Sequence, residues 1–448
     1  MKHTIQKSIP YARHASRLSS AAGLLLWLFL AFSSWANAQT GPPAQVTLSL
    51  TLPKAEKMFV DSNLQLLAAK YNIDAQKALI LQARLYPNPN LSYSQGPIIP
   101  IHDPQSQYPY SDFTTHAENA ATLSQLILLA GKRNKQIKIA EANSTLAEYE
   151  FFDLLRTLKY TLRSDFYNIY FLEQSAHVYD SEIKALQQIA DAYDTEKGKY
   201  ISEKEVIRIK AQLYAFQSEF NELNNQIVDV EGELKLLLKV KPKYHLVPDI
   251  DTAALHKWSP DRFPIATLLD SAYKNRTDLL MAKENTEINK LTYRYQKALA
   301  VPDLTLFVSY DHQGSYAKDF NSAGISFDLP FINRNQGNIK MAKIMIDNTL
   351  ALQQNAEATV EENVTRALQK AYTKNTLNQK INAQFTADFE RLAKEVVDSY
   401  EKRSISILDF LDFYDSYKQN VLQVNTIRYG RIQAFEDINF YTATNFFN

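Results

Sequence analysis

The chain has 448 residues, 49 basic residues balanced by 49 acidic ones, and no cysteine. The balanced charge argues against a nucleic-acid-binding surface, and the lack of cysteine excludes disulfides and thiolate metal sites. Glycine is rare, with 10 residues against 26 tyrosines and 23 phenylalanines, and many charged residues lie in long uninterrupted tracts. This composition indicates a largely helical protein.

Residues 1–38 have the pattern of a secretory signal peptide. Lys7 and Arg13 precede an apolar run over 21–32, and Ala36-Asn37-Ala38 offers a small-x-small cleavage site. The alternative is an N-terminal membrane anchor, but the run is shorter than the roughly 20 residues that span a bilayer. No cysteine follows the cleavage site, so we expect an exported chain without a lipid anchor there. No later stretch reads as a transmembrane helix, so any membrane crossing is expected to use strands.

The remainder contains two copies of one unit, which we place at 39–240 and 265–448 with a linker over 241–264. Three segments of the first copy recur in the second, in the same order: 66–70 as 279–283, 89–93 as 302–306, and 123–134 as 325–336. Repeats on this scale indicate a duplicated supersecondary module. The pattern of each copy predicts a helix, a strand, a loop, a second strand and then a very long helix.

The first helix of copy one is predicted over 54–86, with Thr51 as its cap and Pro53 in its first turn. Pro87-Asn88-Pro89 ends it. Hairpins are predicted over 90–128 and 303–329, with loops over 96–118 and 311–321. In the second hairpin, three apolar residues alternate with polar ones, which is typical of a strand with one apolar face: Ile325, Phe327 and Leu329.

The tract from Lys132 to Lys197 contains no proline or glycine. As one helix it would extend roughly 100 Å. Its apolar seam advances by three or four residues at each step, as in coiled coils. The seam residues are Leu155, Leu158, Leu162, Phe166, Ile169, Leu172, Ala176, Tyr179, Ile183, Leu186, Ala190 and Tyr193. A matching tract runs from Asn338 to about Lys402.

Each long helix needs a partner, and the segments that follow, 202–238 and 404–440, are predicted to return antiparallel to it. Ser202 and Ser406 stand at the N-cap positions of these returning helices. Glu205 completes a capping box with Ser202. The tip turns between the helices therefore lie near 196–202 and 401–406.

The duplicated order and both tip turns resemble the TolC family of outer-membrane efflux channels over essentially all of the mature chain. Ala130-Gly131-Lys132-Arg133 resembles the Gly-Lys-Arg stretch of the CzcC-like heavy-metal branch. The resemblance implies a mainly α fold with a small membrane β-barrel and duplicated long coiled-coil helix pairs. Four strands per chain would form a trimeric barrel of twelve, and the helices a hollow periplasmic cylinder that tapers at the tip turns.

The resemblance further implies a homotrimer in the outer membrane, which acts as the passive exit channel of a tripartite efflux system. Its partners would be outer-membrane lipid, a periplasmic adaptor (membrane fusion protein) and an inner-membrane pump, with no cofactor and no nucleic acid. The alternative is a soluble periplasmic coiled-coil scaffold or adaptor. We expect no enzyme, since no nucleophile elbow, zinc helix or paired-carboxylate cleft is found. The cargo stays open between divalent metal cations and drugs, dyes or peptides.

Asp409 and Asp412 share one helix face just past the second tip turn. In the TolC family, aspartates at this place line the periplasmic entrance, where three chains would form stacked carboxylate rings. The alternative is two solvated aspartates on a coiled-coil exterior. The candidate residues for adaptor contact are those of the tip turns: Gly198, Ile201, Ser202, Arg403, Ile405 and Ser406.

The second tip departs from the better-known pattern of the family at two positions. Arg403 replaces a frequent glycine, and Ile405 stands where some members place a gate-locking arginine. The sequence therefore leaves open whether an ion pair locks the closed gate.

Loop histidines and tyrosines give two weaker hypotheses. His102, Asp103 and His116 in the first hairpin loop, with Asp311-His312 in the second, would form a rim metal site or simply be solvated. Four tyrosines would form an aromatic girdle or pack against loop backbone: Tyr93, Tyr108, Tyr110 and Tyr310.

Overall fold

The computed structural model describes residues 46–96, 118–193, 202–313 and 317–448. Contacts divide the chain into two units, one of residues 1–48 with 241–245 and one of 49–240 with 246–448. In the first unit, the backbone N–H of Val46 donates to the carbonyl of Lys243 at 3.0 Å. The elements that follow lie wholly or in large part in the second unit. The predicted signal peptide lies outside the described residues.

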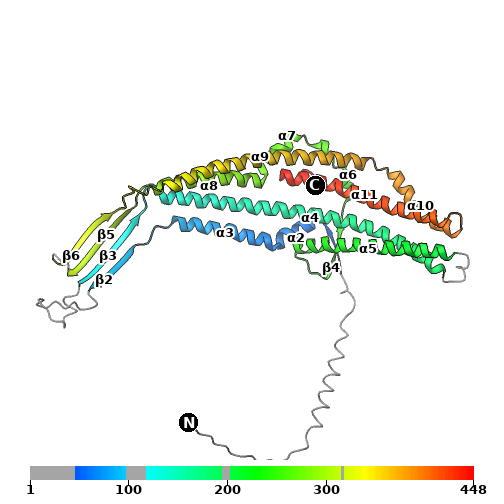
Figure 1. Ribbon diagram of the computed structural model, residues 1–448, viewed down its shortest axis with the longest axis horizontal. Coiled ribbons are helices and arrows are strands. Elements are labelled where there is room, and N and C mark those ends of the chain that lie inside the picture. Colours follow the sequence, from blue (N-terminus) through cyan, green and yellow to red (C-terminus); the bar gives the residue numbers. More distant parts are fainter. Residues whose placement is uncertain (1–45, 97–117, 194–201, 314–316) are drawn as a thin grey trace, which may run out of the picture. The chain divides into compact units, whose positions relative to one another are not determined.

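The duplicated order of elements is confirmed (Figure 1). The first copy contains β1 (Val46–Thr51), α2 (Leu52–Ser62), α3 (Leu64–Arg84), β2 (Asn90–Gly96), β3 (Glu118–Ile127), α4 (Lys132–Tyr193) and α5 (Glu203–Leu238). The second contains α7 (Ile265–Asn275), α8 (Thr277–Leu299), β5 (Leu304–Gln313), β6 (Lys318–Ser326), α9 (Gln336–Gln379), α10 (Ala383–Glu401) and α11 (Ile407–Thr442). Between them lie β4 (Tyr244–Asp249), α6 (Thr252–His256) and the 3-10 turn η2 (Pro260–Arg262).

The prediction of one helix over 54–86 is wrong, because the helix breaks at Asn63. The Asn63 side chain accepts the N–H groups of Gln65 at 2.9 Å and Leu66 at 3.1 Å, and so caps α3. Its amide also donates to the carbonyl of Leu237 on α5 at 3.1 Å. The second copy breaks at Arg276, which has the same offset from Asn63 as Leu279 has from Leu66.

The second long tract, predicted as one helix from 338 to about 402, is also interrupted. α9 ends at Gln379, and the Asn382 side chain accepts the N–H groups of Gln384 at 2.9 Å and Phe385 at 3.3 Å, which starts α10. No proline or glycine marks this break, so periodicity alone passes over it. The first tract is continuous as predicted, with 62 residues in α4.

The linker over 241–264 is more ordered than its weak periodicity predicts. It contains β4, which forms a two-stranded sheet with β1. Leu246, Leu255 and Trp258 are buried. The Arg431 guanidinium of α11 donates to the carbonyls of Leu255 at 3.1 Å and Trp258 at 2.5 Å. The linker therefore packs against α11 and is bonded to it, in addition to connecting the two copies.

Four strands form one antiparallel sheet in the order β2-β3-β5-β6 (Figure 1). The predicted loop over 311–321 is mostly strand, because β5 extends to Gln313 and β6 begins at Lys318. β6 ends at Ser326, so Phe327 and Leu329 lie beyond the strand on which they were predicted.

Cross-strand register gives this sheet two different faces. Leu91, Leu123, Val308 and Ala323 lie in one row across the four strands. On the opposite face another such row holds hydroxyl side chains, Ser92, Thr122, Ser309 and Ser322, and the Thr122 hydroxyl donates to that of Ser309 at 3.1 Å. Alternation of this kind is typical of a sheet that has lipid on one face and water on the other.

The seam predicted on α4 is confirmed as a core contact. Leu162, Phe166, Ile169 and Leu186 are fully buried. α4 packs against α3, α5, α8 and α11, so it is the helix that the others share. Two apolar clusters follow from this packing, one around Trp258 and one that joins α4 and α5 to α10 and α11 near the tips.

Candidate functional site

The second tip turn holds Arg403 in a left-handed conformation, with φ at 59°. This region is costly for residues with a Cβ, which explains why glycine is frequent at the position in the resembled family. The N–H of Ser404 donates back to the carbonyl of Ser399 at 2.9 Å, and the N–H of Arg403 to that of Tyr400 at 2.9 Å. These bonds satisfy carbonyls at the end of α10 and turn the chain toward α11.

Asp409 has a role that the sequence interpretation missed. Its carboxylate accepts the Ser406 hydroxyl at 2.7 Å and the Ser406 backbone N–H at 3.3 Å, while the N–H of Asp409 donates to the Ser406 hydroxyl at 3.2 Å. The two residues form a capping box at the start of α11, where a negative charge is also favoured by the helix dipole. In copy one, the glutamate three residues after Ser202 predicts such a box. In copy two, the aspartate three residues after Ser406 is the equivalent pattern.

Asp412 lies one turn further along α11. Asp409 and Asp412 are both exposed, and neither makes an ion pair within the described part of the chain. The structure therefore places both carboxylates on the accessible surface beside the tip.

Ile405, which stands where some members of the resembled family place a gate-locking arginine, is partly buried against the apolar cluster near the tips. In that cluster the rings of Tyr400 and Phe410 stack with centroids 4.9 Å apart. The side chain at 405 therefore packs within its own subunit.

The first tip turn is described only from Ser202 onward, so Gly198 and Ile201 lie outside the described residues. The predicted capping box is confirmed. The N–H of Ser202 donates to Glu205 at 2.8 Å, and the N–H of Glu205 donates to the Ser202 hydroxyl at 3.3 Å.

The Gly-Lys-Arg stretch lies where the sheet joins the helices. Lys132 is 4% exposed, and its ammonium lies 2.6 Å from Asp303 and 2.7 Å from the carbonyl of Val301. The Arg133 guanidinium donates to the carbonyl of Arg84 at 2.8 Å and lies 4.1 Å above the ring of Tyr86. The stretch therefore ties the start of α4 to the segments that lead into β2 and β5.

The second copy repeats one of these contacts with a different residue. Asn335 takes the place of Arg133 in the repeat, and its amide donates to the carbonyl of Gln296 near the end of α8 at 2.8 Å. Each copy thus bonds the start of its long helix to the end of its preceding helix.

The hydroxyls of Tyr93 and Tyr310 bond to side chains rather than loop backbone, to Asn119 at 2.9 Å and Asp319 at 2.7 Å. His312 also contacts Asp319, at 2.8 Å. Tyr108, Tyr110, His102, Asp103 and His116 lie outside the described residues. No group of three or more potential metal ligands occurs among the residues that are described.

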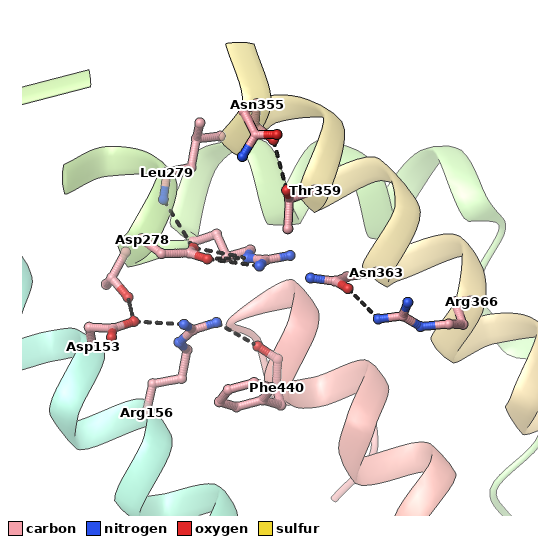
Figure 2. A network of polar contacts seen from close by, with 11 residues as sticks. Asp153, Arg156, Asp278, Leu279, Asn355, Thr359, Asn363, Arg366 and Phe440 are labelled. Atoms are coloured by element: carbon pink, nitrogen blue, oxygen red, sulfur yellow. Dashed lines mark hydrogen bonds and ion pairs between the residues drawn. The ribbon is translucent and has the colours of Figure 1, made fainter. Parts of the chain in front are cut away.

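A polar network joins α4, α8 and α11 where α8 begins (Figure 2). Asp153 accepts from Arg156 at 2.6 Å and from the Thr277 hydroxyl at 2.7 Å. Arg156 also donates to the carbonyl of Phe440 at 3.1 Å and lies 4.4 Å above its ring. The break between α7 and α8 is therefore fixed onto α4 and α11.

Burial would raise the pKa of Asp278, but hydrogen bonds and charge from Arg276 outweigh it and hold the pKa below its usual value. Beside the network lies a pocket of about 360 Å³, whose lining includes four basic and four aromatic residues. The carboxylate that lines this pocket, Glu436, forms an ion pair with Arg163 at 2.7 Å, and this ion pair does not suit a general base.

Across the described ranges, no helix has both the length and the apolar character required to traverse a bilayer.

No protein-family profile matches the chain. The cobalt-zinc-cadmium resistance protein CzcC of Cupriavidus metallidurans is 21% identical over 302 residues, which cover 67% of this chain and 68% of that protein. The Campylobacter jejuni CmeC outer membrane channel superposes with a TM-score of 0.70 and 16% identity, over 87% of this chain and 85% of that one. CusC, a transmembrane channel, gives a TM-score of 0.69 and 13% identity over 91% and 95% of the two chains.

The fold is therefore that of the outer-membrane channels. Within that class, the resemblance to the TolC family and to its CzcC-like branch is confirmed. The comparisons support the channel over the soluble scaffold, because CmeC is an outer membrane channel and CusC forms a transmembrane channel.

Proposed function

We propose that this chain is the outer-membrane exit channel of a tripartite efflux system and works as a homotrimer. The observation that carries the proposal is the four-stranded sheet, which has one apolar and one polar face and two outer strands, β2 and β6, that pair on one side only among the described residues. A bilayer does not tolerate such open edges.

The strand order supplies a way to close them. With four antiparallel strands in sequence, β2 and β6 run in opposite directions, so β6 of one copy can pair antiparallel with β2 of the next. Repetition around a threefold axis gives twelve strands and no edge. The helices that follow each hairpin would extend into the periplasm.

The cargo that we propose is divalent metal cations. Support comes from the cobalt-zinc-cadmium resistance relative and from Asp409 and Asp412, which would form two stacked carboxylate rings in a trimer. Such rings attract cations and repel anions. Ser202, Arg403, Ile405 and Ser406, with Gly198 and Ile201, would meet the periplasmic adaptor, while an inner-membrane pump supplies the energy.

Cell fractionation tests the channel itself. We expect a detergent-requiring trimer in the outer-membrane fraction, with residues 1–38 removed from the mature chain. A soluble monomer in the periplasmic fraction would contradict the proposal and restore the scaffold alternative.

Planar-bilayer conductance tests the entrance rings. The double variant Asp409→Asn with Asp412→Asn removes both charges, and asparagine at 409 still offers an oxygen to the Ser406 N–H. We expect a clear loss of preference for cations over anions at about the same conductance. Asp270→Asn, an exposed carboxylate on α7, is the control. Unchanged selectivity in the double variant would remove both residues from the entrance.

A further inference from the structure

Glu182 is a buried carboxylate in the middle of α4. It is 2% exposed, and neither of its oxygens has a hydrogen-bond partner among the described residues. A buried charge without a partner is costly, so burial favours the neutral carboxylic acid.

The cation whose charge acts on Glu182 is already shared by two other carboxylates. Lys418 of α11 is 4% exposed, and its ammonium lies 2.7 Å from Glu219 of α5 and 3.1 Å from Asp415 of α11. The same ammonium lies 4.2 Å from the ring centroid of Phe216. An ionised Glu182 would add a third negative charge around one positive charge, and Glu182 itself is screened little because it is buried.

The other titratable groups facing Glu182 are tyrosines and further carboxylates. Tyr179 on α4 donates to Glu219 at 2.9 Å. The charge of Glu182 also acts on Tyr414 and Tyr417 of α11, and that of Glu390 on α10 acts on Tyr417. None of these groups supplies a positive charge near pH 7.

Burial is the main reason that the pKa of Glu182 rises from 4.5 to about 8. The charge of Lys418 opposes the shift, and the negative charges of Asp415 and Glu219 add to it.

We infer that docking of α11 onto the α4–α5 pair is coupled to a proton on Glu182. The neutral carboxyl lets the three helices pack, and the ionised carboxyl weakens the contact. The break between α9 and α10 at 380–382 leaves α10 and α11 as a pair joined by their own tip turn. A looser tip at higher pH is the expected consequence for transport, and only that consequence rests on the proposed function.

The direction of the pH dependence follows from the raised pKa. Docking is strongest below 4.5, weakens as pH rises toward about 8, and changes little above it. Because one proton is involved, the population of separated helices should rise about tenfold per pH unit between these limits.

A single thiol can measure that population, because the chain contains no cysteine. Ser175 lies two turns before Glu182 on α4, is 5% exposed, and accepts the amide of Asn425 on α11 at 3.0 Å. In the Ser175→Cys variant of the full protein, maleimide labelling requires α11 to move away from α4. The labelling rate is measured from pH 5 to 9 with Glu182 intact, with Glu182→Gln, and with Asp180→Asn as an exposed carboxylate control on the same helix.

Dividing the labelling rate measured with Glu182 intact by the rate measured with Glu182→Gln cancels the titration of the thiol itself. We expect this ratio to rise about tenfold per pH unit and to level off near pH 8, while the Asp180→Asn control follows the protein with Glu182 intact. A ratio that is constant with pH would overturn the inference.

Infrared spectroscopy gives a second reading that does not depend on helix motion. A protonated-carboxyl band at pH 7 that is absent in Glu182→Gln is expected, and absence of that band from the unsubstituted protein would also overturn the inference. Failure of the protein to conduct ions in bilayers would count against the proposed channel and leave both readings intact.

Discussion

The ammonium of Lys132, at the start of α4, lies 2.6 Å from the carboxylate of Asp303, just before β5. The Lys132 side chain is 5% exposed and that of Asp303 24%. Asp303 also accepts the N–H of Leu129 at 2.9 Å. One ion pair therefore joins the first copy to the second at the root of the sheet.

Replacing Lys132 with Met should destabilise the protein by about 2–4 kcal/mol, because it leaves a partly buried carboxylate without its cation. The measurement is the thermal unfolding midpoint of the detergent-solubilised protein. Lys138→Met, at an exposed position on the same helix, should change it little. Adding Asp303→Asn to Lys132→Met should recover part of the loss, and purely additive losses would show that the pair is not coupled.

Arg403 occupies a left-handed backbone conformation that glycine adopts without a steric cost. Arg403→Gly should therefore be more stable than Arg403→Ala by about 1 kcal/mol. Comparing these two variants removes the contribution of the arginine side chain, since both lack it. Equal unfolding midpoints would show that the tip turn relaxes around a Cβ.

Gly324 on β6 lies directly opposite Phe307 on β5, an apolar residue on the polar face. A Cβ at Gly324 would lie 2.5 Å from the Phe307 ring. Gly324→Ala should destabilise the sheet by about 1–3 kcal/mol through overpacking, and adding Phe307→Leu should restore most of it. Gly232→Ala in α5, where a Cβ meets nothing within 4 Å, should instead stabilise the protein. A neutral Gly324→Ala variant would mean that the ring moves aside freely.

Asp165 on α4 has its pKa raised from 3.8 to about 7, first by burial and then by the charge of Glu233. An acid with a raised pKa in the folded state costs stability as pH rises from its ordinary pKa through the folded value. Asp165→Asn should therefore raise the unfolding midpoint at pH 8, by the equivalent of about 1–3 kcal/mol, and change it little at pH 4. The same gain at both pH values would assign the effect to packing rather than to charge.

Local sequence patterns are sufficient to predict the duplicated order of elements, the seam of α4, both hairpins and the caps at Ser202 and Ser406. These features depend on residues that are close neighbours along the chain, such as the three- and four-residue steps of the seam and a serine three residues before an acid. The same local patterns carry the resemblance to outer-membrane channels.

The breaks at Asn63 and Arg276 could not be predicted from local patterns, because the groups that stabilise each break come partly from elsewhere in the chain. The Asn63 amide bonds to Leu237 on α5, and the network around Arg276 reaches α4 and α11. Glu182 is the clearest case. In the sequence, Glu182 lies beside the apolar seam and resembles a solvated helix residue. It is buried because α11, which follows more than two hundred residues later and carries Lys418, packs over it. Periodicity predicts which face of a helix is buried, whereas the partner helix decides which charged groups lie against that face.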